Sequence, residues 1–372
     1  MSIEIPLSIK YRPKKLSEVI GQPVIVKAFT NAFKNKTLHH AYILAGAYGT
    51  GKTTTARIVA AMDNCEKTSS LEPCGKCRNC QEIFEGKSFD VREIDAASNR
   101  GIDDVRAIHK NLYSSPIQCK VKYVLIDEVH SLTGYAAEAA LKMIEEPPDH
   151  TRFILCTTDP HKLKDTIHSR CILWAFNKVS WTEIYNHLCN ISKKENLEYE
   201  EMALKTMAKM AKGSVRDSLQ NLQTVVNYVG SDKITDEQVR EALGTIDEKL
   251  YFDLIEAILS TDILKCYQII DVIFRTGKEA GIVINDMYSY LNNLLKAKFC
   301  KNNLSDFSLT EEEIKRYIYQ ANKMKGELIL KIMNLMNKVG FSISVNLNPR
   351  DSFDQFVVEA VKIKVDLEEK VK

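Results

Sequence analysis

The sequence has no run of about 18 apolar residues, the length that a membrane-spanning helix requires. Its N-terminus lacks the basic and apolar stretches of a secretory signal, and the chain has no internal repeat or low-complexity linker. The formal net charge is only +2, so any DNA-binding surface must come from the local placement of Lys and Arg. We therefore expect a cytoplasmic protein, and its 372 residues predict two or three domains.

Ten cysteines in a chain without a signal favour a reducing compartment. Six are scattered along the chain, and we expect them to be small, mostly buried hydrophobic residues: Cys119, Cys156, Cys171, Cys189, Cys266 and Cys300. The other four are clustered and have the spacing C-x₈-C-x₂-C-x₂-C: Cys65, Cys74, Cys77 and Cys80. Four thiolates suit a closed, structural zinc site, and Gly75 would help the chain turn around the metal. An iron–sulfur cluster is the alternative, and a disulfide is disfavoured.

The first half of the sequence alternates short apolar runs with helical patterns. The runs predict strands at residues 42–45, 90–95, 123–127, 153–157 and 172–176. Strand and helix in this alternation predict a parallel five-stranded sheet with helices on both faces, an α/β fold. This part of the chain, residues 1–178, is the first predicted domain, and the cysteine cluster at about 65–80 lies within it.

Only helical patterns follow. Ser180-Trp181-Thr182-Glu183 is a capping box that begins a helix, and Gly213 and Gly244 are predicted to cap the ends of later helices. These features predict a small helical domain over residues 179–244. The longer helices expected at 250–259, 263–275, 280–298, 311–323, 325–339 and 352–364 predict an all-α domain over residues 245–372.

A complete phosphate-binding loop lies between the first strand and the first long helix. Gly46 to Thr53 matches the G-x-x-x-x-G-K-[ST] pattern in the strand–loop–helix context that the chemistry requires. Glycines let backbone N–H groups face the phosphates, Lys52 would reach the β- and γ-phosphates of ATP, and Thr53 would bind Mg²⁺. The predicted ATP-binding residues here are Gly46, Ala47, Tyr48, Gly49, Thr50, Gly51, Lys52, Thr53 and Thr54.

Two further strands end in polar residues that suit ATP hydrolysis. Asp127 would help to bind the Mg²⁺, and Glu128 would orient and polarise the attacking water. Thr157, at the end of the next strand, is a candidate for positioning that water. The alternative is that Thr157 is an ordinary polar strand end.

A series of motifs occurs in the order found in AAA+ ATPases of the bacterial DNA polymerase III gamma/tau family, and the sequence resembles that family densely over residues 8–245. The motifs are Tyr11-Arg12-Pro13, Val19-Ile20-Gly21-Gln22, His39-His40-Ala41-Tyr42, Ile94-Asp95-Ala96-Ala97-Ser98, Ile126-Asp127-Glu128-Val129-His130, Leu141-Lys142-Met143-Ile144-Glu145-Glu146-Pro147-Pro148, Thr157-Thr158-Asp159-Pro160 and Ser169-Arg170-Cys171. Beyond residue 245 the resemblance is weaker. It implies an AAA+ phosphate-loop domain with a zinc insertion, a helical lid and a helical collar.

The resemblance also implies roles in ATP binding and hydrolysis. Arg170 would reach a neighbouring subunit's ATP site and stabilise charge on the transferred phosphoryl group, whereas the alternative is a surface ion pair. Arg216 would contact the γ-phosphate from the lid, whereas the alternative is a solvated helix end. Five N-terminal residues resemble the adenine-contacting segment: Tyr11, Arg12, Pro13, Val19 and Ile20.

Partners follow from the same resemblance. The collar would join copies of this chain with delta-like and delta-prime-like subunits in a pentamer that loads a sliding clamp onto primer–template DNA. Arg100, Lys142 and Lys162 would contact DNA phosphates, although each has a solvated helix face as its alternative, and Asn99 falls where some relatives carry a basic residue. Because the chain ends after the collar, it resembles the short gamma form.

Three alternative functions remain at this point. An adaptor that cannot hydrolyse ATP is disfavoured, since Lys52, Thr53, Asp127 and Glu128 are all present. Another AAA+ enzyme on DNA, such as a helicase or a helicase loader, is disfavoured by the cysteine spacing together with Ser169-Arg170-Cys171. A zinc module for binding alone does not explain the ATP motifs.

Overall fold

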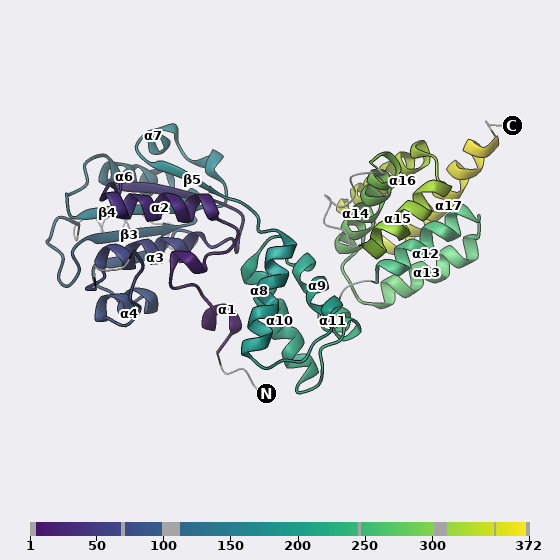
Figure 1. Ribbon diagram of the computed structural model, residues 1–372. Helices are drawn as coiled ribbons and strands as arrows, with labels where there is room; N and C mark the ends of the chain where they lie inside the picture. The colour runs from purple at the N-terminus through teal and green to yellow at the C-terminus, as the bar shows by residue number, and fades with distance from the viewer. Residues whose placement is uncertain are drawn as a thin grey trace. The chain divides into compact units, whose positions relative to one another are not determined.

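The structure is a computed structural model that describes residues 5–67, 71–98, 112–244, 247–300, 311–345 and 347–369. It forms two compact units, Met1–Asp236 and Glu237–Lys372 (Figure 1). Within the described ranges, no helix is both long and apolar enough to cross a membrane. Each unit is described separately below.

The first unit contains a parallel five-stranded sheet (Figure 1). Its strands are β1 (Ala41–Gly46), β2 (Val91–Asp95), β3 (Lys122–Asp127), β4 (Thr151–Thr157) and β5 (Ile172–Phe176). The strand order is β2-β3-β4-β1-β5, so the chain returns past β1 after β4 and adds β5 on its other side. In this order β4 lies between β1 and β3, so Gly46 at the end of β1 shares one edge of the sheet with Asp127 at the end of β3 and Thr157 at the end of β4. The predicted α/β fold is confirmed.

Helices cover both faces of this sheet. One face packs against α2 (Pro23–Asn35), α3 (Lys52–Asn64) and α4 (Arg78–Glu85). The other packs against α6 (Gly134–Glu145) and α7 (Asp165–His168). Shorter elements are α1 (Leu7–Lys10) and the 3₁₀ turns η1 (Leu16–Glu18), η2 (Val129–Ser131) and η3 (Pro160–Lys162). Burial on both faces explains why the three central strands, β1, β3 and β4, read as nearly continuous apolar runs.

Four helices follow the sheet: α8 (Trp181–Lys194), α9 (Glu201–Met210), α10 (Val215–Val229) and α11 (Asp236–Ala242). The predicted capping box is formed, since the Ser180 hydroxyl accepts from the Glu183 N–H and the Glu183 carboxylate accepts from the Ser180 N–H. The predicted role of Gly213 was wrong, because α9 ends at Met210 and its cap is Ala211. Gly213 has φ +92°, and a Cβ there would lie 2.6 Å from the Cβ of Lys178, so close approach to that residue requires glycine.

The second unit is helical throughout the ranges described. It contains α12 (Glu248–Leu259), α13 (Ile263–Arg275), α14 (Ala280–Phe299), α15 (Glu311–Lys323), α16 (Gly326–Ser344) and α17 (Pro349–Glu369). The last two helices are longer than the sequence pattern predicted. Their apolar faces meet in one core, which also contains a buried polar contact in which the Tyr290 hydroxyl donates to the Gln320 side chain at 2.6 Å.

Candidate functional site

The phosphate loop connects β1 to α3, and its glycines hold backbone that other residues rarely adopt. Gly46 has φ +155°, and a Cβ there would lie 2.4 Å from the carbonyl oxygen of Phe176 in β5. Gly49 has φ +71°, and a Cβ there would lie 1.9 Å from the Ser214 hydroxyl oxygen. Both positions therefore exclude a side chain by backbone conformation and by space. The Thr50 hydroxyl donates to the Ala47 carbonyl at 2.8 Å and tightens the turn.

Lys52 is the first residue of α3 and is only 5% exposed. Its ammonium donates to the carbonyl oxygens of Gly46 at 2.8 Å and Ala47 at 2.9 Å, so the lysine folds back over its own loop. Burial lowers the pKa of Lys52, and the carboxylates of Glu128 and Asp127 oppose that shift. A cation that is largely removed from water and held by two neutral acceptors is well suited to binding an anionic phosphate.

The loop is joined directly to the end of β3. The Thr53 hydroxyl donates to an Asp127 carboxylate oxygen at 2.7 Å, although 74 residues separate them in the sequence. A hydroxyl and a carboxylate oxygen are ligands that Mg²⁺ prefers in phosphate-binding sites. The structure therefore brings together the two residues that the sequence predicted as magnesium ligands.

Glu128 follows β3 in a left-handed backbone conformation, with φ +49°. Its carboxylate accepts from the Thr158 hydroxyl at 3.0 Å and lies 3.3 Å from Nδ1 of His130. The same His130 nitrogen is 3.0 Å from the hydroxyl oxygen of Thr157, which is fully buried and also accepts from the Asp159 N–H at 3.1 Å. One imidazole therefore links the two residues predicted to position and activate water.

His130 and Thr158 were missed in the sequence analysis as functional residues. The available signal was their spacing: His130 stands two residues after Glu128, and Thr158 directly follows Thr157. Spacing alone could not show which of the two threonines holds the glutamate. That assignment depends on the parallel pairing of strands that are distant in the sequence.

The phosphate loop also contacts the first turn of α10. The Gly49 carbonyl accepts from the Val215 N–H at 3.0 Å, and the Arg216 N–H lies 3.5 Å from the same oxygen. The Ser214 hydroxyl accepts from the Asp217 N–H at 3.1 Å and caps the helix. Arg216 is therefore placed at the start of a helix that contacts the loop, as its predicted role requires.

Of the predicted adenine-contacting residues, Val19 lies beside the phosphate loop, whereas Tyr11 bonds to a residue after α8. Val19 is next to the loop, since its Cγ1 would lie 3.9 Å from a Cβ at Gly51. Tyr11 instead hydrogen-bonds to Glu195, which follows α8, and partial burial together with that bond raises the pKa of Tyr11 to about 12. Arg12 is exposed, and Pro13 and Ile20 are partly exposed.

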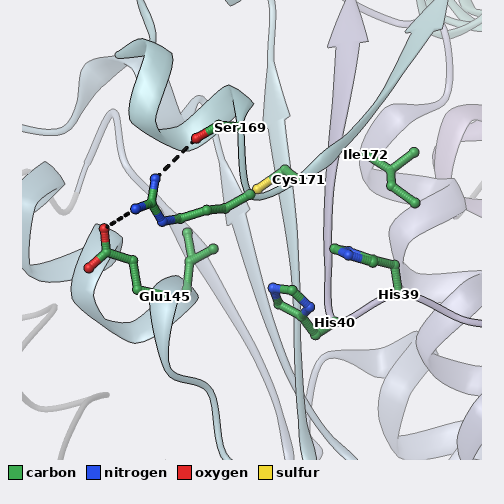
Figure 2. A pocket seen from close by; sticks show the side chains of 8 residues that line it. His39, His40, Glu145, Ser169, Cys171 and Ile172 are labelled. Atoms are coloured by element: carbon green, nitrogen blue, oxygen red, sulfur yellow. Dashed lines mark hydrogen bonds and ion pairs between the residues drawn. The ribbon is translucent and has the colours of Figure 1, made fainter.

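Arg170 lies beside a cavity of about 380 Å³ on the first unit (Figure 2). Its guanidinium forms an ion pair with Glu145 at 3.0 Å and donates to the Ser169 hydroxyl at 3.0 Å and the Thr166 carbonyl at 2.9 Å. His39 and His40 lie across the same cavity, with ring centroids 4.2 Å apart (Figure 2). These contacts hold the partly exposed guanidinium of Arg170 against α6 and α7. None of these contacts is with the chain's own phosphate loop.

The four clustered cysteines form a site that fits a metal ion. Their sulfur atoms all lie within 4.8 Å of one another, close to the separation of about 3.8 Å that tetrahedral zinc–thiolate bonds impose. Backbone N–H groups point at the sulfurs, with Cys77 N–H at 3.2 Å from Cys74 Sγ and Cys74 N–H at 3.4 Å from Cys65 Sγ. The Lys76 N–H is the largest of the contributions that lower the pKa of Cys74 to about 6, which favours a thiolate.

The predicted DNA-contacting residues are only partly described. Lys142 is exposed on α6, and Lys162 is exposed in η3, where it forms an ion pair with Asp159 at 3.1 Å. Arg100 lies outside the described residues. Contact with DNA therefore stays a prediction for all three residues.

Family models match most of the chain. They are the DNA polymerase III delta subunit over residues 21–180, the ATPase lid domain of the DNA polymerase III clamp loader subunit over 183–222, and domain III of the DNA polymerase III gamma and tau subunits over 234–362. The DNA polymerase III subunit gamma of Buchnera aphidicola subsp. Schizaphis graminum is 38% identical over 336 residues, which cover 88% of this chain and 90% of that protein. The chain belongs to the DNA polymerase III gamma/tau family.

Gamma/tau proteins of other bacteria show the same relationship. The tau subunit of Escherichia coli is 34% identical over 322 residues, which cover 86% of this chain and 50% of that protein. The tau subunit of Bacillus subtilis is 32% identical over 349 residues, which cover 94% of this chain and 62% of that protein. Among solved structures, the Bacillus subtilis clamp loader delta protein aligns over 90% of this chain and 99% of its own, with 16% identity and a TM-score of 0.42.

Membership in the gamma/tau family confirms the predicted resemblance, function and enzyme class. The chain is a clamp-loader ATPase subunit of DNA polymerase III and acts in DNA replication. The roles of individual residues, the ions and the finer set of partners remain proposals.

Proposed function

We propose that this chain binds and hydrolyses ATP at its phosphate loop and uses that cycle to open a sliding clamp and load it onto primer–template DNA. The observation that carries the proposal is the hydrogen bond of 2.7 Å from Thr53 to Asp127. It joins the phosphate loop to the strand that precedes Glu128, which supports a role in hydrolysis for the side chains at this edge of the sheet.

Each side chain has a role that its surroundings support. Loop N–H groups and Lys52 would bind the phosphates, and Thr53 and Asp127 would hold Mg²⁺, which supplies charge neutralisation at the β- and γ-phosphates. Glu128 would accept a proton from water as the new P–O bond forms and the bond from the γ-phosphorus to the bridging oxygen breaks. His130 and Thr158 would hold the Glu128 carboxylate, and Thr157 would help to position the water.

Two arginines would couple hydrolysis to movement. Arg216 would contact the γ-phosphate from α10, and the backbone contact between Gly49 and Val215 supports this placement. Arg170 would act on a neighbouring subunit's ATP, since its ion pair with Glu145 orients it on a partly exposed surface. A guanidinium supplied in this way stabilises charge that develops on the transferred phosphoryl group.

The remaining assignments follow from the family. Residues 1–178 would form the nucleotide-binding domain, 179–244 the lid and 245–372 the collar that joins copies of this chain to delta-like and delta-prime-like subunits in a pentamer. The cysteine cluster would hold a structural Zn²⁺, and Lys142 and Lys162 would contact DNA phosphates without reading sequence. The protein would act in the cytoplasm.

The test is steady-state ATP hydrolysis by the chain assembled with its partner subunits, with and without clamp and primed DNA. We expect strong stimulation that needs both, and its loss in Lys52→Ala. Arg170→Ala should lower hydrolysis by about 10³-fold or more while ATP binding is retained, and Lys164→Ala is the matched control for another exposed cation in the same region. Hydrolysis driven by DNA alone and indifferent to the clamp would contradict the proposal and favour another AAA+ enzyme that remodels DNA.

A further inference from the structure

Glu72 lies in the segment of the cysteine cluster and hydrogen-bonds to a distant part of the chain, the turn η1. It lies between Cys65 and Cys74 in sequence, and its two carboxylate oxygens accept from the backbone N–H groups of Leu16, at 2.8 Å, and Ser17, at 3.1 Å. Both bonds are charge-assisted, and together they fix the first turn of η1. Neither bond was expected from the sequence, since more than 50 residues separate the partners.

The turn η1, to which Glu72 bonds, is followed directly by a residue that lies beside the phosphate loop. Leu16 is fully buried in the same core as Cys65, Cys77 and Cys80, so η1 and the cysteine cluster share one packed interior. Val19 follows η1 immediately, packs against that core, and lies beside Gly51 of the phosphate loop. A displacement of the cysteine cluster would therefore be transmitted through Leu16 and Ser17 to a residue next to the loop.

We propose that Glu72 is a positioning residue that ties residues 16–20 to the cysteine cluster, so that ordering of the cluster by its metal sets the affinity of the chain for ATP. The inference rests on the proposed nucleotide site, and it adds a structural route by which the cysteine cluster affects the affinity of that site for ATP. The effect falls on binding and not on the chemical step, because Lys52, Asp127 and Glu128 are held by their own contacts at the sheet edge. It also falls on recognition of the adenosine part, since η1 leads to Val19.

The experiment measures binding of a fluorescent ATP analogue to the zinc-loaded chain. Glu72→Ala removes both acceptors and should weaken binding by about tenfold, whereas Glu72→Gln keeps one acceptor and should have a smaller effect. Glu66→Ala is the matched control, because Glu66 is an exposed carboxylate between the same two cysteines. Hydrolysis at saturating ATP should stay close to wild type in all three variants.

A second probe separates positioning from general damage. Inorganic tripolyphosphate presents the phosphates without the adenosine, so its own dissociation constant, obtained by competition and corrected for the affinity of the analogue, should be the same in Glu72→Ala as in wild type. Removal of zinc by a chelator should weaken ATP binding to the wild type and have no further effect in Glu72→Ala.

The outcomes are distinct. If Glu72→Ala binds ATP as tightly as Glu66→Ala, or if tripolyphosphate binding falls in parallel with ATP binding, the inference is overturned. If zinc removal weakens ATP binding equally in wild type and Glu72→Ala, the proposed route through Glu72 is also overturned. If the wild type itself does not bind ATP, the failure belongs to the proposed function instead.

Discussion

The two ends of α3 show how one helix serves two different kinds of site. At its N-terminal end, Lys52 and Thr53 bond to loop carbonyls and to a carboxylate, partners that phosphate and metal ion could replace. At its C-terminal end, the fully buried Asn64 accepts from the N–H groups of Lys120 and Val121 and donates to the Val121 carbonyl, all at 3.0 Å or less. The side chains at the N-terminal end have hydrogen-bond partners that a ligand could displace, whereas the side chain of Asn64 at the C-terminal end has all its hydrogen bonds to backbone groups.

The comparison also shows that α3 is attached to β3 at both ends. Thr53 bonds to Asp127, the last residue of the strand, and Asn64 bonds to Val121, just before the strand begins. The position of the Asp127 carboxylate relative to the phosphate loop is therefore fixed by contacts at both ends of the helix. We expect changes at the N-terminal end to affect turnover and changes at the C-terminal end to affect stability.

The largest expected effect is on turnover. Glu128→Gln should lower the rate of ATP hydrolysis by about 10²- to 10⁴-fold, because an amide cannot accept the proton from water. ATP binding and the melting temperature should stay within error of wild type in parallel titration and thermal-unfolding measurements. A large fall in melting temperature would show that the carboxylate near Lys52 is structural too, and the contrast between the surroundings of the two ends of α3 would be lost.

Metal removal tests the other end of the helix. If the cysteine cluster holds the proposed zinc, chelation should lower the melting temperature of the chain by about 10 °C, because binding of a structural metal contributes to folding. Differential scanning calorimetry before and after zinc is added back measures the effect. An unchanged melting temperature in a chain shown to have lost its metal would contradict a structural role.

Asn64→Ala should destabilise the chain by about 2–4 kcal/mol, because it removes the three hydrogen bonds of a fully buried side chain to the N–H groups of Lys120 and Val121 and to the Val121 carbonyl. Chemical denaturation measures the loss. Asn64→Asp keeps the acceptor for both N–H groups but loses the donor to Val121, so it should cost less than the alanine variant. Equal losses in the two variants would mean that the bonds to Lys120 and Val121 contribute nothing.

The smallest effect expected is a pH dependence near the entry to β2. Burial raises the pKa of Asp90, but bonds from the N–H groups of Cys119, Gln118 and Ile117 outweigh it, and the net pKa is lowered. The stabilisation is thus fully present above the unfolded value of about 3.9 and is lost as the pH falls through the lower folded value. Asp90→Asn should cost about 1–2 kcal/mol at pH 7 and less in acid; a cost independent of pH would argue against an ionised Asp90.

Local signals predicted most of the fold. The apolar runs located all five strands, and the capping box located the start of α8, because burial and capping act over a few residues. The strand order was not predicted, since it depends on pairings such as Ala45 with Thr157 between distant segments. Gly213 was assigned a cap because glycine after an apolar helical pattern is common there, and its close approach to Lys178 has no local signature.

The candidate site divides in the same way. Motif spacing identified Lys52, Thr53, Asp127 and Glu128 as a set, and the structure brings them together. The contacts of His130, Asn64 and Glu72 could not be predicted, because each polar side chain meets its partner through packing of segments that the sequence does not order.

The hydrogen bond between the Gly49 carbonyl and the Val215 N–H joins the phosphate loop to the lid through main chain alone. A substitution at Val215 leaves the bond in place unless the new residue is proline, which has no N–H, and a larger residue at position 49 meets Ser214. The Val215 amide proton can exchange with deuterated solvent only when the loop and α10 separate, so its exchange rate reports how often the lid opens. Comparing this exchange rate with and without nucleotide would show how far nucleotide binding slows the separation, and the protein needs no label.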